Sequence, residues 1–145
     1  MRAAASAGIL EVLGSQLTHN QAQGGDGTSG ATAGNGFGGG LFVAGATAAL
    51  TDTPVDHNQA VGGGGNGGNG GNGSGGGVYV AAGTVVVSAS KITHNTARGG
   101  DGDNGGTDGQ GVGGGVYNLG TFYFDAATLI AGNHASTSND DGFGY

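Results

Sequence analysis

Residues 92–97, ITHNTA, are one copy of a phrase that occurs four times in the chain. Every copy begins with an apolar residue and has Asn at its fourth position, and three of the four have His at the third. The copies are LTHNQA (17–22), VDHNQA (55–60), ITHNTA (92–97) and IAGNHA (130–135). Their asparagines are 38, 37 and 38 residues apart, so the 145-residue chain is built from an internal repeat.

Two further phrases keep the same period. They are GGGLFV (38–43), GGGVYV (75–80) and GGGVYN (113–118), and then GATAAL (45–50), GTVVV (83–87) and GTFYF (120–124). Apolar residues alternate within them, with Val85 and Val87 facing inward and Val86 outward, which is the period of a β-strand. Each repeat therefore predicts three short strands and one Gly-rich insert.

A repeat of this kind predicts an all-β fold, a right-handed parallel β-helix of about three and a half coils in a single domain, residues 1–145. One coil cannot bury its own apolar face, whereas stacked coils form a continuous core. The inward columns are Leu17, Val55, Ile92 and Ile130; Leu41, Val78 and Val116; and Val12, Leu50, Val87 and Phe124. No cap for either end is recognisable, so we expect either a fragment of a longer solenoid or a unit that stacks end to end.

The four asparagines fall at one corner of successive coils. Identical side chains in stacked parallel strands lie about 4.8 Å apart, so their amides can bond to one another along the axis. We expect Asn20, Asn58, Asn95 and Asn133 to form such a structural ladder.

GGGVYN, GTFYF and ITHNTA resemble the right-handed parallel β-helices of bacterial surface and secreted proteins. Among these, the chain is similar to polymorphic outer-membrane protein and autotransporter passenger repeats, which carry a GG(A/G)(I/V) phrase and an apolar-x-x-Asn phrase. The resemblance extends from about Ile9 to Asn133. It implies an extracellular or cell-surface location and a structural or adhesive role.

The Gly-rich inserts, 23–40, 61–77 and 98–115, leave the same corner of successive coils. The middle insert repeats GGN three times, which matches an extended left-handed helix of three residues per turn. Glycine also lets such strands approach closely enough to bond sideways. Two alternatives remain open at this point: a stacked, glycine-lined fin, or flexible linker-like loops.

Charge and composition exclude several functions. The net charge is −7, and Arg2, Lys91 and Arg98 are the only lysine or arginine residues, which disfavours nucleic acid and anionic membrane surfaces as partners. The chain has no cysteine, so it forms no disulfide or thiolate metal site. No apolar run reaches the roughly 18–20 residues of a membrane-spanning helix, and we expect no membrane insertion.

Two groups of residues are candidate metal ligands. GGDGDNGGTD (99–108) is similar to a calcium-binding nonapeptide of β-helices, and Asp101, Asp103 and Asp108 could hold calcium, although solvated loop carboxylates are the favoured interpretation. His19, His57 and His94 share one column with Gly132, which indicates a left-handed turn and leaves a metal ladder as the alternative. No cofactor is predicted.

Outward columns offer two further surfaces. Phe42, Tyr79 and Tyr117 could stack against glycan rings, or could simply pack along the sheet, which we favour. Thr18 and Thr93 face outward in another column of the kind that ice-binding β-helices use, but Asp56 interrupts it.

Catalysis has little support in the sequence. Glu11 is the only glutamate, no pair of aspartates recurs beside a base or a cation, and no nucleophile motif is present. We therefore expect a non-catalytic structural or adhesive element of an extracellular or cell-surface protein, which associates with itself or with neighbouring coils and could form a filament. The alternative is a carbohydrate-binding or polysaccharide-processing β-helix.

Overall fold

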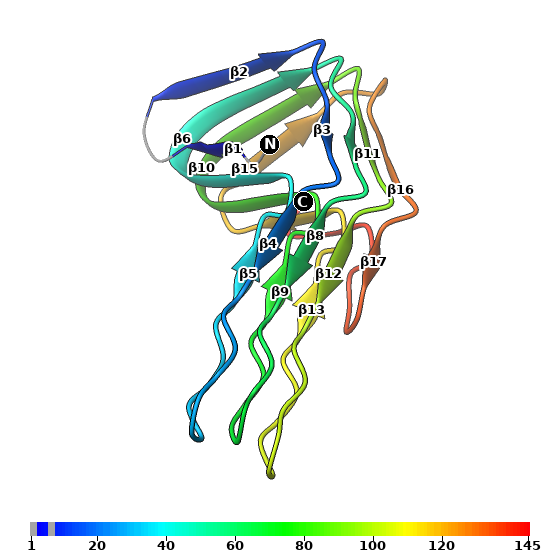
Figure 1. The fold of residues 1–145 in the computed structure, drawn as a ribbon. Coiled ribbons are helices and arrows are strands. Elements are labelled where there is room, and N and C mark those ends of the chain that lie inside the picture. Colours follow the sequence, from blue (N-terminus) through cyan, green and yellow to red (C-terminus); the bar gives the residue numbers. More distant parts are fainter. Residues whose placement is uncertain (1–2, 6–7) are drawn as a thin grey trace.

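The computed structural model describes residues 3–5 and 8–145. These residues contain no helix, and their strands stack in parallel as a β-solenoid of about three turns (Figure 1). The all-β parallel solenoid predicted from the repeat is thereby confirmed.

The largest sheet contains the longest strands of each turn. Its members are β1 (Ala3–Ala5), β2 (Ile9–Leu13), β6 (Leu41–Thr51), β10 (Val78–Ser88), β14 (Val116–Asn118), β15 (Thr121–Phe124) and β18 (Gly142–Phe143). Figure 1 shows β6 and β10 curving round the solenoid. The sequence predicts two strands within residues 41–51 and two within residues 78–88, but β6 and β10 are each one continuous strand. Gly45 (φ 94°) and Gly83 (φ 93°) turn the backbone there, and the pairing continues through a bulge.

Three smaller sheets complete each turn. The second sheet contains β3 (Leu17–Thr18), β7 (Val55–Asp56), β11 (Lys91–Thr93) and β16 (Leu129–Ala131). The third contains β4 (Gln21–Gln23), β8 (Gln59–Val61), β12 (Thr96–Arg98) and β17 (His134–Ala135). The fourth contains β5 (Gly36–Phe37), β9 (Gly73–Ser74) and β13 (Gly111–Val112). The predicted inserts thus contribute strands of their own.

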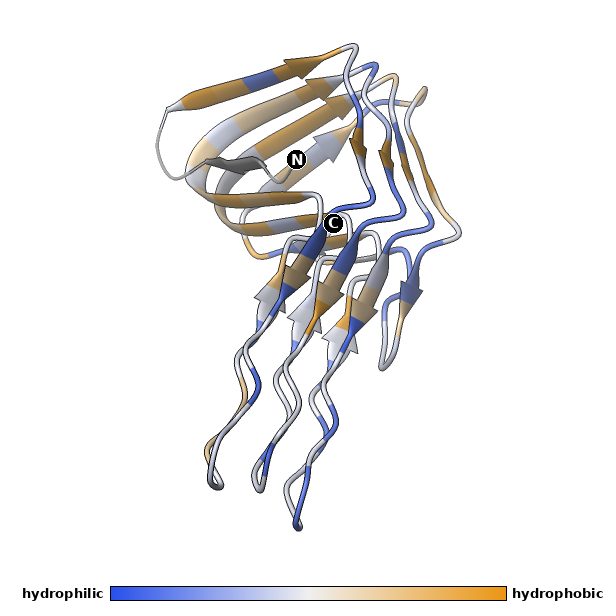
Figure 2. Cartoon of the chain, in the orientation of Figure 1, coloured by the Kyte–Doolittle hydropathy of each residue, from blue (hydrophilic) through white to orange (hydrophobic). Residues whose placement is uncertain are grey.

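The core contains most members of the predicted apolar columns, whereas Val12 and Ile130 are only partly buried against it. Pairing aligns Leu17 with Val55 and Val55 with Ile92, and Leu41 with Val78, so that like residues stack from turn to turn. Figure 2 shows these strands as the most hydrophobic part of the chain. Phe124 departs from the prediction because it is 47% exposed. It lies on the edge strand β15, where the ring of Tyr145 packs edge-on against it.

Between the third and fourth sheets the chain makes three long hairpins, here called fingers 1, 2 and 3: residues 24–35, 62–72 and 99–110. They project side by side from one corner of the solenoid (Figure 1). Finger 1 turns at Ser29 (φ 50°) and Gly30 (φ 86°), and finger 3 at Asn104 (φ 49°) and Gly105 (φ 87°). Two successive left-handed residues are typical of a tight hairpin turn.

Candidate functional site

The fingers are joined to one another by backbone hydrogen bonds. Every third N–H between residues 24 and 36 donates to a carbonyl of the next turn at 2.8–3.2 Å, the periodicity of an extended helix with three residues per turn. The donors are Gly24, Gly27, Gly30, Ala33 and Gly36. Finger 2 donates to finger 3 in the same direction, for example from Gly65 N–H to the Asp101 carbonyl at 2.8 Å. The structure therefore has the first of the two alternatives, an ordered fin.

A second set of bonds links six glycines in one continuous path, here called the glycine spine. Each return arm donates to the outgoing arm of its own finger, and each outgoing arm of fingers 2 and 3 donates to the return arm of the preceding finger. From donor to acceptor the path runs through Gly109, Gly100, Gly71, Gly63, Gly34 and Gly25, with N···O distances of 2.8–3.0 Å.

The spine requires glycine at most of its positions. A Cβ on Gly71 would lie 1.9 Å from the carbonyl oxygen of Gly34, and a Cβ on Gly109 would lie 1.8 Å from that of Gly71. No side chain fits at such an approach. Gly25, at the end of the path, is different because a Cβ there would meet nothing within 4 Å.

The outer edge of finger 3 is closed by side chains of the same chain. Gly99 and Gly102 of this finger, and Gly111 directly after it, occupy positions whose counterparts one turn earlier donate to backbone carbonyls of the next turn. Here the N–H groups donate instead to side chains, from Gly99 to Ser136 Oγ (3.2 Å), from Gly102 to Asp108 Oδ1 (2.8 Å) and from Gly111 to Thr137 Oγ1 (3.1 Å). Asp108, one of the calcium candidates, thus caps the fin.

The other two calcium candidates lie on the outgoing arm of finger 3. Asp101 and Asp103 line an open hollow of about 410 Å³ together with Asp26, which is not among the predicted ligands, and Asp101 also lines a second hollow with Asp108. All three carboxylates of the larger hollow are exposed, and two accept backbone hydrogen bonds: Asp26 from Gly64, and Asp103 from Gly67. These aspartates secure one finger to the next.

The asparagine column lies at the corner that precedes the fingers. Asn58 and Asn95 are fully buried, and each donates both its backbone N–H and its side-chain amide to the Oδ1 of the next asparagine at 2.9–3.0 Å. Their side-chain amides also donate to the carbonyls of Leu17 and Val55. With every polar atom used in this way, the ladder is a structural element.

The aromatic column forms a continuous stack. Phe42, Tyr79, Tyr117 and Phe143 lie ring over ring with centroids 5.4, 5.2 and 4.8 Å apart. Phe37 covers Tyr79 at 4.8 Å, and Tyr79 is only 9% exposed. Burial, and then the neighbouring Tyr117, raise the pKa of Tyr79 above its ordinary value. The stack therefore contributes packing along the sheet.

The histidine column occupies a left-handed turn. His19, His57 and His94 have φ values of 55°, 53° and 51°, and Gly132 has φ 68° in the corresponding place. The rings of His19 and His57 are stacked 5.2 Å apart, and those of His57 and His94 are 4.9 Å apart. Turn geometry thus accounts for the sharing of one position by His and Gly.

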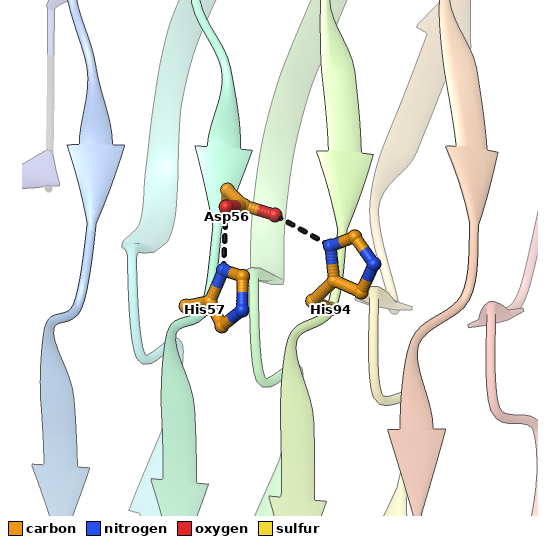
Figure 3. A group of neighbouring side chains, drawn as sticks. All are labelled: Asp56, His57 and His94. Atoms are coloured by element: carbon orange, nitrogen blue, oxygen red, sulfur yellow. Dashed lines mark hydrogen bonds and ion pairs between the residues drawn. The ribbon is translucent and has the colours of Figure 1, made fainter.

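Asp56 is joined by hydrogen bonds to two of these histidines, as Figure 3 shows. Its Oδ2 is 2.5 Å from Nδ1 of His57, and its Oδ1 is 2.9 Å from Nδ1 of His94. Thr93, its partner on the adjacent strand, donates from Oγ1 to Asp56 Oδ1 at 2.7 Å. The sequence predicts His57 and His94 as candidate ligands of a metal ladder, but its only signal for Asp56 is that this residue interrupts a threonine column.

The cluster keeps the Asp56 carboxylate ionised. Burial by itself would raise the pKa of Asp56, but hydrogen bonds from Thr93, His94 and His57 and the charge attraction of His57 outweigh it and lower the pKa from 3.8 to about 2. Asp56, His57 and His94 each present one ligand atom, and these atoms lie within 4.8 Å of one another. In the described part of the chain this group could hold a metal ion.

No protein-family model matches the chain, and neither a curated protein nor a solved structure matches it. Within residues 3–5 and 8–145, no helix has the length and apolar character needed to cross a lipid bilayer. What the molecule does must therefore be inferred from its own fold and contacts.

Proposed function

We propose that the chain is a non-catalytic structural and adhesive element of an extracellular or cell-surface protein, in which the solenoid holds the fin as a rigid contact surface. The glycine spine is the observation that carries this proposal. Fixing backbone costs roughly 1–2 kcal/mol per residue, and glycine loses the most freedom of all residues. Because ordering the three glycine-rich fingers carries this cost, we infer that the function of the protein depends on their ordered shape.

The polar side chains support a passive role because most of the conspicuous ones serve the scaffold. Asparagines bond to the next turn, and Asp26, Asp103 and Asp108 hold backbone amides of the fin. In the described residues, no buried side-chain nitrogen or oxygen lacks a hydrogen-bond partner. Such complete use of polar atoms is typical of a structural element rather than of a reactive site.

An extracellular or cell-surface location is supported by two features. The repeat phrases resemble those of autotransporter passenger domains, which work outside the cell. Lys91 and Arg98 are the only Lys or Arg residues among those that the structure describes, so proteases that cleave after basic residues find few sites.

Assembly into a filament is a further form of the proposal, and one contact bears on it. In the last turn Asn133 donates to Asp141 Oδ1, which occupies the place of the next asparagine. A second copy stacked on this end through its own Asn20 would have to displace Asp141. We therefore favour the single unit, and light scattering over a concentration series should show a constant particle size.

Adhesion can be tested with a matched pair of variants. The purified chain is applied to glycan arrays, mucin and cell surfaces, together with Gly71→Ala, which breaks the glycine spine, and Gly25→Ala, which does not. We expect Gly71→Ala to lose binding and Gly25→Ala to keep it, while circular dichroism shows an intact solenoid in both. Equal binding by Gly71→Ala would remove the fin from the proposal.

Glycan binding through the aromatic stack is the second candidate. It is supported by Phe42 and Tyr117, which remain partly exposed on either side of the buried Tyr79. Partly exposed aromatic rings offer an apolar face and, in tyrosine, a polar edge to a sugar. Tyr117→Ala should abolish glycan-array signals if this surface is used, whereas the Gly71→Ala variant should keep them.

A further inference from the structure

We propose that Asp56, His57 and His94 form a binding site for a divalent transition-metal ion of the zinc class. The three residues come from two adjacent turns of the solenoid, at the ends of β7 and β11. Both Nδ1 atoms face the same carboxylate, at 2.5 Å from Oδ2 and 2.9 Å from Oδ1 (Figure 3). The site is independent of the fin and of the proposed adhesive function.

The chemistry of the three donors fits this class of ion. Imidazole nitrogen suits zinc, copper and nickel, and two histidines with one carboxylate are a recurrent zinc set. The ion would take the place of the Nδ1 protons, and each neutral imidazole would keep its proton on Nε2. The histidine side chains are 52% and 61% exposed, so water can reach the ion and complete its coordination.

The backbone holds the ligands in place before any ion arrives. Each histidine follows a short strand and precedes a fully buried asparagine, and both have a left-handed φ. Thr93 donates to Asp56 Oδ1 and so orients the carboxylate from outside the ligand set. Such outer partners fix the geometry of metal ligands and tune affinity. Both histidine rings are exposed, so they can rotate to admit an ion.

The neighbouring turns show that the site is specific to one place in the column. In register with Asp56, the preceding strand has Thr18 and the following strand has Thr93. His19 therefore stacks on His57 without an aspartate beside it in its own strand. The last turn has Gly132 where the others have histidine. Each ligand can thus be replaced by a residue that the fold already accepts at the same position.

Isothermal titration of the metal-free full-length chain with ZnCl₂ tests the proposal. We expect one ion per chain, with the affinity reduced by at least about tenfold in Asp56→Thr and in His94→Gly, since losing even an outer-shell partner costs roughly 10–100-fold. His19→Asn keeps a residue that tolerates the left-handed turn and should bind zinc as the wild type does. Circular dichroism verifies that each variant is folded.

Nuclear magnetic resonance gives a second readout. Zinc should shift the ring signals of His57 and His94 and leave those of His134, which pairs with Asp140 at 3.5 Å elsewhere in the fold, unchanged. Undiminished zinc binding by Asp56→Thr, loss of binding only in His134→Asn, or no binding at millimolar zinc would each overturn the proposal.

Discussion

The side-chain amide of Asn133 donates to Oδ1 of Asp141 at 3.0 Å, and the backbone N–H of Asn133 donates to the same oxygen at 3.1 Å. These are the two bonds that Asn95 makes to Asn133 one turn earlier. Asp141 thus takes the part of a fifth ladder residue although it lies only eight positions away along the chain. All the amides of the ladder donate in one direction, toward the next turn. The last two donors, on Asn133, therefore need an acceptor, and the carboxylate of Asp141 supplies it.

This contact predicts different effects for two substitutions of Asp141. Asp141→Ala leaves two donors of Asn133 without their acceptor, and we expect a loss of about 1–3 kcal/mol in the free energy of unfolding. Asp141→Asn keeps an oxygen in place and should lose less than about 1 kcal/mol. Urea denaturation measures both. An alanine variant as stable as the wild type would show that the cap contributes nothing.

The middle of the ladder should be more sensitive than its end. Asn95→Ala removes the Oδ1 that accepts two hydrogen bonds from Asn58, and it also removes the amide that donates to the Val55 carbonyl. Each buried group left unpaired costs about 1–3 kcal/mol, so we expect a larger loss than for Asp141→Ala. Asn66→Ala, at an exposed asparagine whose φ is not left-handed, is the control and should change the urea midpoint little. The reverse order of Asn95→Ala and Asp141→Ala would contradict the ladder.

Gly71→Ala should open the fin and leave the solenoid folded. The added Cβ would lie 1.9 Å from the Gly34 carbonyl oxygen, so the arms of fingers 1 and 2 must separate. We expect fast hydrogen exchange at the spine amides of Gly34, Gly63 and Gly100, with protection kept at Val78 and Val87 in the core. Gly25→Ala, where the Cβ has free space, should exchange as the wild type does. Unchanged protection in Gly71→Ala would refute the interlocked arrangement.

Acid should weaken the corner at Asp56. The folded-state pKa of Asp56, about 2, lies below the ordinary value of 3.8, so as the pH falls the unfolded chain binds a proton first and is favoured. The contribution of Asp56 to stability is therefore present above about pH 4 and is lost as the pH approaches 2. Unfolding of wild type and Asp56→Thr in chelator, from pH 6 to pH 2, should show a difference that shrinks over this range. A difference that does not change with pH would contradict the hydrogen-bonded carboxylate.

The repeat made the solenoid predictable because equal spacing fixes which residues pair. Leu17, Val55 and Ile92 had to stack once their asparagines were aligned, and the structure pairs them. The sequence could not show that Leu41–Thr51 is one strand, because Gly45 reads equally well as a break between strands or as a bulge within one.

Two of the contacts that were not predicted involve residues that do not follow the repeat. Asp56 replaces a threonine in its column, and the cluster that it forms depends on a contact with His94 of the next turn. Asp141 belongs to a short closing loop whose spacing matches no other turn. The sequence does not decide between a fin and flexible loops, because the bonds of the fin are made by backbone atoms and glycine offers no side chain from which a register could be inferred.

The construction of the fin also gives it an adjustable length. From Asn58 to Asn95 the period is 37 residues rather than 38, yet the body of each turn is constant, since Leu41 to Asn58, Val78 to Asn95 and Val116 to Asn133 each span 17 positions. The missing residue lies in the stretch that contains finger 2, and the spacing of residues in the solenoid body is the same without it. One added triplet in each arm would lengthen a finger by about 9 Å at 3.1 Å per residue. Reach can therefore change without altering the core, provided that all three fingers change together.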